Sequence, residues 1–175
     1  FKAQLTAADA ARWIGKYAAL MRRAHRAIER HAARVLLYAS LDPIWEPLPF
    51  DGVAHIGGRR LLDGLWDSLG VSMDWSVAIH PYGDPAADTG PNWINFRALG
   101  SIARYQEEKL RGLGAFSNAA PQLRLFASEQ GWQQKEGDEI RARNVCLAHD
   151  ESLRLPNVLG VTHIEFQAIS AMGPP

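Results

Sequence analysis

The chain has 175 residues, and its 19 Lys and Arg residues balance its 19 Asp and Glu residues. A protein without net positive charge competes poorly for nucleic-acid phosphates, so we expect no nucleic-acid partner. No apolar run reaches the roughly 18 to 20 residues that a membrane-spanning helix needs, so no membrane span is predicted. Cys146 is the only cysteine, which excludes an internal disulfide and a cysteine-based zinc site.

Helical periodicity and short apolar runs alternate along the chain. From Ala10 to Ile28, apolar residues recur at spacings of three and four, which predicts an amphipathic helix. The same pattern predicts helices over residues 59–69, 94–111 and 139–153. Short, nearly continuous apolar runs predict buried strands over residues 34–40, 75–80, 123–128 and 158–163. This order is typical of parallel βαβ units, in a single α/β domain over residues 1–175.

Two architectures fit this alternation. A doubly wound open sheet keeps its chemistry where the strand order reverses, whereas a (β/α)8 TIM barrel gathers residues from many strand ends around one axis. All four predicted strands end in polar or aromatic residues, which favours the barrel. A complete barrel takes about 250 residues, so four βα repeats amount to roughly half of one. The chain lacks glycine-rich phosphate-binding fingerprints, and no cofactor is predicted.

Glu129 carries the sharpest chemical signal. It follows the predicted strand 123–128 and precedes Gly131 and Trp132. A carboxylate at the end of a strand is positioned to attack an anomeric carbon or to transfer a proton. Gly131 permits a sharp turn, and Trp132 can form an apolar wall or a platform on which a sugar ring stacks. The alternative interpretation is a solvated loop carboxylate.

The first two predicted strands end in further candidate residues. His80 and Tyr82 can hydrogen-bond a substrate hydroxyl or hold a catalytic carboxylate. Asp42 can cap a turn or line the site. Trp45 lies in a predicted loop, where an aromatic ring suits carbohydrate stacking, although such a ring can also serve loop packing.

The last predicted strand ends near His163 and Gln167, which complete the candidate substrate-binding set. Together with His80 and Asp42 they suggest a metal site as an alternative. No HxH, HExxH or comparable spacing is present, so no metal is predicted. Cys146 lies on the apolar side of a predicted helix and is expected to be a small core residue.

Three strand ends together resemble a known enzyme family. They are residues 75–82 (WSVAIHPY), 127–132 (ASEQGW) and 161–163 (VTH). These segments resemble the second half of retaining glycoside hydrolases of the large (β/α)8 superfamily called clan A. They are more closely similar to a bacterial, glycosidase-like domain of unknown function. The resemblance covers about residues 34–167, and its most specific parts are Glu-Gln-Gly-Trp and His-Pro-Tyr.

The resemblance implies a role for each matching residue. Glu129 would be the nucleophile at the end of the seventh barrel strand. His80 and Tyr82 would shape the site and orient that carboxylate, and Trp132 and His163 would line the sugar subsite. The predicted strands would be the fifth to the eighth. The acid/base glutamate of the fourth strand, which usually follows an asparagine, would then lie upstream of this chain.

The resulting prediction is the C-terminal half of a glycoside hydrolase that acts on a polysaccharide or glycoside. A retaining mechanism needs two carboxyl groups about 5 to 5.5 Å apart. Glu129 supplies one, whereas Glu165 and Asp42 are weak substitutes for the second. We therefore expect the isolated fragment to be inactive and to need the missing N-terminal half of the barrel. Two alternatives stay open: a non-catalytic carbohydrate-binding barrel and a metal-dependent hydrolase.

Overall fold

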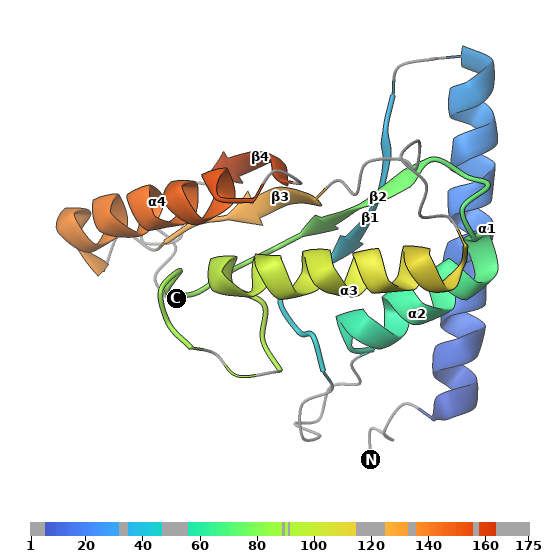
Figure 1. Ribbon diagram of the computed structural model, residues 1–175, viewed down its shortest axis with the longest axis horizontal. Coiled ribbons are helices and arrows are strands. Elements are labelled where there is room, and N and C mark those ends of the chain that lie inside the picture. Colours follow the sequence, from blue (N-terminus) through green and yellow to red (C-terminus); the bar gives the residue numbers. More distant parts are fainter. Residues whose placement is uncertain are drawn as a thin grey trace, which may run out of the picture.

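A computed structural model describes residues 6–31, 35–46, 56–88, 90, 92–114, 125–132, 136–155 and 158–163 (Figure 1). The described helices are α1 (Ala7–His31), α2 (Gly58–Leu69), the short 3-10 helix η1 (Phe96–Ala98), α3 (Leu99–Gly112) and α4 (Asp138–Leu153). The described strands are β1 (Leu37–Leu41), β2 (Trp75–Ile79), β3 (Leu125–Gln130) and β4 (Val158–His163). Each helix between two strands is long enough to carry the chain back for a parallel pairing.

The strands form one parallel sheet in chain order, β1-β2-β3-β4. The predicted α/β class and the alternation of helices and strands are therefore confirmed. A doubly wound sheet needs a reversal of strand order, and the four described strands contain none.

Most element boundaries differ from the sequence prediction by one to three residues, and two of the differences concern the ends of β3 and α3. The strand β3 continues through Glu129 and Gln130, which were predicted as loop, because Gln130 pairs with His163 of β4. The helix α3 begins at Leu99 instead of residue 94. Asn95 caps the preceding turn of η1, where its side-chain oxygen accepts a hydrogen bond from the backbone N–H of Ala98 at 3.3 Å.

One face of the sheet carries the hydrophobic core. Its strand residues are spaced two apart, as the pleat requires. They are Ala39, Leu41, Val77, Ile79, Leu125 and Ala127. They join one cluster with buried residues of α2 and α3, which Figure 1 shows in front of the strands. Burial of this apolar area is the main force that holds the layers together.

The opposite face of the sheet is more polar. Tyr38 and Phe126 are half-buried there, with ring centroids 5.8 Å apart, and Ser40 is exposed. The sequence predicted a first strand that is buried on both faces. That prediction is wrong for β1, where Ala39 and Leu41 are buried on one face and Ser40 is exposed on the other. In the described sheet β1 is an edge strand. The hydroxyl of Tyr17 on α1 accepts a hydrogen bond from the backbone N–H of Ser40 at 3.2 Å, which occupies one donor of this edge.

On the long helices, some apolar residues of the predicted buried face are exposed to solvent. On α1, Trp13 and Leu20 stay 60% and 61% exposed. The prediction that Cys146 belongs to the core is wrong, because its side chain is exposed. The buried residues of α4 lie four apart and are Asn144, Ala148 and Ser152. None of the described helices combines the length and apolar character needed to span a membrane.

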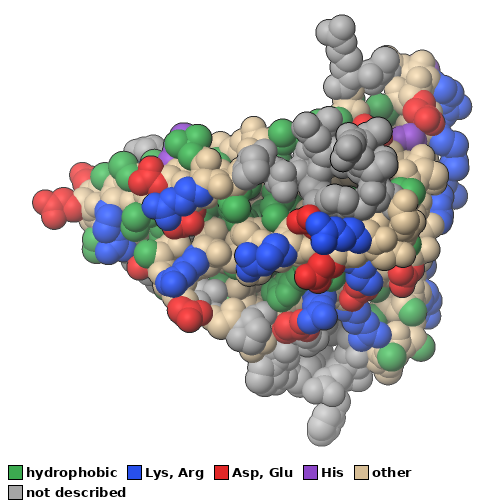
Figure 2. All heavy atoms as spheres, viewed as in Figure 1, with side chains coloured by type: hydrophobic (Ala, Val, Ile, Leu, Met, Phe, Trp, Pro, Cys, Tyr) green, Lys and Arg blue, Asp and Glu red, His purple; other side chains and the backbone are tan. Residues whose placement is uncertain are grey.

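Charged side chains of both signs share the surface of the helical layer. On the face drawn in Figure 2, Lys and Arg are interspersed with Asp and Glu. Across α2 and α3, the Lys109 ammonium contacts the Asp63 carboxylate, to which the Tyr105 hydroxyl also donates a hydrogen bond at 2.8 Å. Opposite charges on α2 and α3 are therefore paired at this place on the surface.

The helices α1 and α2 pack most closely at Gly64. A Cβ atom at this position would lie 2.7 Å from Cγ2 of Ile14, which is closer than real Cβ contacts allow. Arg60 also joins the two helices, donating a hydrogen bond to the carbonyl oxygen of Ala7 at 3.2 Å. The small residue thus lets the two backbones approach each other.

This contact yields a stability prediction. Ile14 is β-branched and has little rotamer freedom to move away from a new methyl group. We expect Gly64→Ala to lower the free energy of unfolding by about 1–3 kcal/mol, despite the better helix propensity of alanine. Gly15→Ala in α1 is the matched control, because a Cβ atom there meets nothing within 4 Å. It should raise the free energy of unfolding by about 1 kcal/mol. Urea denaturation measures both, and equal effects would contradict the packing argument.

Candidate active site

The carboxyl ends of β1, β2 and β3 meet at one edge of the sheet. Leu41 pairs with Ile79, and Ile79 pairs with Ala127. The next residues along these strands, which include Asp42 and His80, therefore lie at the same level. Side chains predicted from separate parts of the sequence come together here because parallel strands point the same way.

His80 lies at the centre of this group. Its Nδ1 is 3.3 Å from Oδ1 of Asp42, and its Nε2 is 3.0 Å from Oγ of Ser40 and 3.7 Å from Oε2 of Glu129. In the tautomer with the proton on Nδ1, Nε2 accepts from the Ser40 hydroxyl, and in the other tautomer Nε2 donates to it. The imidazole is only 20% exposed, whereas the Asp42 side chain is 84% exposed. His80 thus connects a solvent-facing carboxylate with Glu129.

Tyr82 holds the Glu129 carboxylate directly. Its hydroxyl donates a hydrogen bond to Oε1 of Glu129, while the Glu129 side chain stays 40% exposed. Burial raises the pKa of the Tyr82 phenol, and the hydrogen bond to Glu129 and the nearby carboxylate charges raise it further. Tyr82 is therefore a protonated donor at neutral pH. One Glu129 oxygen is held, and the carboxylate remains open to a reacting molecule.

A bulge in β3 orients Glu129. Between Ala127 and Gln130, β3 advances three residues, whereas β4 advances only two, from Val161 to His163. Strict alternation would place Glu129 on the same face as Ala127, which is in the core. The extra residue breaks the alternation and turns the side chain toward the strand-end cluster.

The loop after β2 is held from three directions. The Asn95 side chain donates to the carbonyl oxygen of Asp84 at 2.9 Å, and Arg143 of α4 donates to the Asp84 carboxylate at 3.2 Å. The Trp132 indole N–H donates to the carbonyl oxygen of Gly83 at 3.0 Å. These contacts fix the segment that carries Tyr82. The sequence analysis missed Arg143 and Asn95; an asparagine just before a helix was the one available signal, for a cap.

The structure places the other predicted site residues away from the Glu129 cluster, beside it, or outside the described part of the chain. Trp132 lies beside the site loop but is only 5% exposed, so its ring serves as a wall and not as an open platform. Trp45 lies in a separate hollow. His163 ends β4, but its side chain is not described, and Gln167 and Glu165 lie outside the described residues.

The described residues contain no group of three His, Cys, Asp or Glu side chains arranged to hold a metal ion. Asp42 and Glu129 approach different nitrogens of His80 and do not converge on one point. The imidazole of His80 lies between the two carboxylates, and each of its nitrogens faces one of them.

The contact between Tyr82 and Glu129 can be measured through the phenol. Subtracting the ultraviolet pH titration of Tyr82→Phe from that of the wild type isolates Tyr82, whose midpoint should lie above the ordinary value of about 10. Burial is the largest cause of the raised pKa and the Glu129 hydrogen bond is the next, so the folded state favours the protonated phenol, and this preference stabilises the fold below about pH 10. This stabilisation is lost as the pH rises through the folded-state pKa. Circular dichroism verifies that the protein is folded, and a midpoint at or below 10 would contradict the contact.

No protein-family model, curated protein or solved structure matches this chain. What the site does must therefore be inferred from the chemistry of its own side chains.

Proposed function

We propose that this chain carries the nucleophile of a retaining glycoside hydrolase that acts on a polysaccharide or glycoside. One observation carries the proposal: Glu129, at the carboxyl end of a parallel strand, accepts a hydrogen bond from Tyr82 and lies beside His80. A nucleophilic carboxylate must be held in one orientation and be reachable. The Tyr82 hydrogen bond supports the first requirement, and the partial exposure of Glu129 supports the second.

The proposed reaction has two steps. A Glu129 oxygen attacks the anomeric carbon as the bond to the leaving oxygen breaks, and a second carboxylic acid protonates that oxygen. Water then attacks the glycosyl ester, gives its proton to the second carboxylate and releases Glu129. Through its hydrogen bond, Tyr82 positions Glu129 before the first step. We propose that the second carboxyl group comes from a strand that precedes β1 and is not part of these 175 residues.

A half-barrel architecture belongs to the same proposal. The strands follow one another in chain order, and right-handed crossovers, the nearly universal hand, place the connecting helices on one face of such a sheet. This arrangement is the repeating unit of a (β/α)8 barrel. The opposite face, with Tyr38 and Phe126, would then line the barrel interior once another set of strands pairs with the edge of β1.

The test is made on the native protein that contains this chain, with aryl glycosides and polysaccharides as substrates. Glu129→Gln should lower turnover about a thousandfold or more while the fold is kept, because an amide is not a nucleophile at this centre. Azide should rescue Glu129→Gly and give a glycosyl azide of inverted configuration, since the small anion attacks from the face that the carboxylate vacated. The isolated 175-residue chain should be inactive.

Glu139→Gln is the matched control, because Glu139 is an exposed carboxylate in the first turn of α4. It should leave turnover unchanged. Equal activity of Glu129→Gln and wild type would refute the nucleophile. Binding of sugars without any turnover would favour a carbohydrate-binding barrel, and loss of turnover on metal chelation would favour a metal-dependent hydrolase.

A further inference from the structure

A second concave site borders the loop that carries Tyr82. It has a volume of about 420 Å³ and is lined by the segments that follow β1 and β2, together with residues of α2 and α3. An isolated antiparallel bridge between Ile44 and Trp93 joins these segments, and the backbone N–H of Trp45 donates to the carbonyl oxygen of Asn92 at 2.9 Å. The volume lies in the range of small-molecule sites. Two separate loops are thus held together around one hollow.

Two indole rings line this hollow, from Trp45 and Trp93. Both side chains are half-buried, and Trp45 packs edge-on against Tyr105 with ring centroids 5.3 Å apart. A ring fixed in this way presents a flat apolar face at little cost in conformational entropy. Such faces pack well against the C–H side of a sugar ring, which is also flat and apolar.

Charged side chains line the hollow beside the two indoles, together with the apolar residues Ile94, Ala98 and Ile102. Arg59 pairs with Glu46 at 3.2 Å, and Arg97 donates a hydrogen bond to the carbonyl oxygen of Ala86 at 3.1 Å. Asp88 also lines the hollow. The two arginines and the two carboxylates cancel in charge, which disfavours a phosphorylated ligand or a polyanion. Paired donors and acceptors beside aromatic rings suit the vicinal hydroxyls of a neutral sugar.

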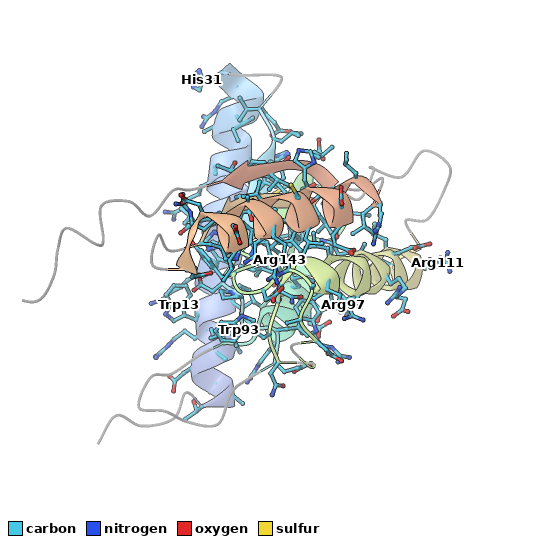
Figure 3. All side chains as sticks on the ribbon, turned by 90° about the vertical axis from the view of Figure 1, so that its left-hand side faces the viewer. Trp13, His31, Trp93, Arg97, Arg111 and Arg143 are labelled. Atoms are coloured by element: carbon cyan, nitrogen blue, oxygen red, sulfur yellow. The ribbon has the colours of Figure 1, made fainter. Side chains whose placement is uncertain are left out.

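The hollow and the Glu129 cluster share one structural element. Tyr82 lies at the Glu129 end of the connection from β2 to η1, whereas Ala87 and Asp88 line the hollow. Asn95 lines the hollow and donates to the carbonyl oxygen of Ala87 at 2.8 Å. Figure 3 shows Trp93, Arg97 and Arg143 near this connection, while Trp13 belongs to α1. The two sites are therefore neighbours with separate side chains.

We propose that this hollow is an accessory binding site for a neutral oligosaccharide, with Trp45 and Trp93 as stacking platforms and Arg59 and Arg97 as hydroxyl donors. The choice of a sugar rests on the proposed function, but binding in the hollow does not require Glu129. A chain bound here lies next to the loop that positions Tyr82. The site would thus hold a polysaccharide close to the catalytic carboxylate.

The test is a calorimetric titration of the native protein with neutral oligosaccharides of glucose, xylose, mannose and galactose, and with acidic oligosaccharides for comparison. Trp93→Ala should weaken binding of the recognised sugar about tenfold or more. Arg97→Met should weaken it several-fold. Because Arg97 is exposed, this substitution is expected to leave the fold intact, so a loss of binding would not reflect misfolding. Trp13→Ala is the matched control, since that indole is exposed on α1, and it should bind like the wild type.

The outcomes separate this proposal from the proposed function. If Trp93→Ala and Arg97→Met bind like the wild type, or if the wild type binds acidic oligosaccharides only or no oligosaccharide, the accessory site is refuted. Glu129→Gln should keep the Trp93-dependent binding. If Glu129→Gln retains full turnover while Trp93→Ala loses binding, the nucleophile assignment fails and the accessory site stands. If Glu129→Gln loses turnover while Trp93→Ala binds like the wild type, the nucleophile assignment stands and the accessory site is refuted.

Discussion

The in-register parallel pairing of β1, β2 and β3 is the constraint on which the candidate site depends. Because Leu41, Ile79 and Ala127 lie side by side, the residues that follow them emerge at one edge of the sheet. The pairing is held by the core on the helix-facing side, where a shift by one residue would turn apolar side chains into solvent. The energy that fixes the site therefore comes largely from hydrophobic burial several residues away.

Within this sheet, Glu129 is oriented by the backbone of β3, by two neighbouring side chains and by the contacts that hold the loop of Tyr82. The bulge in β3 turns its side chain toward the cluster, Tyr82 holds one of its oxygens, and His80 lies against the other. Arg143 and Trp132 then hold the loop that carries Tyr82. The contacts of Arg143 and Trp132 restrict the loop, and the loop places Tyr82 against Glu129. A carboxylate on a half-exposed strand end is thus kept in one orientation without being buried, which suits a group that must meet a ligand.

The same loop also borders the hollow with two indoles, so the Glu129 cluster and the hollow share one structural element. Asn95 holds the loop from the side of the hollow, and Arg143 holds it from the side of α4. A ligand that stacks between Trp45 and Trp93 would add contacts to an element that already positions Tyr82. Binding of a ligand in the hollow and the orientation of Glu129 would then depend on the same few hydrogen bonds.

The sequence by itself determined the alternation of helices and strands and the chemical types at the strand ends, because periodicity and turn residues are local signals. Thus Glu129, His80 and Tyr82 could be chosen as candidates from the sequence, and the structure places them side by side. Only the tertiary structure decided the strand order, the bulge that orients Glu129, the burial of Trp132 and the position of Trp45 in a separate hollow. These features depend on register and on contacts between residues far apart in the chain, which no local pattern records.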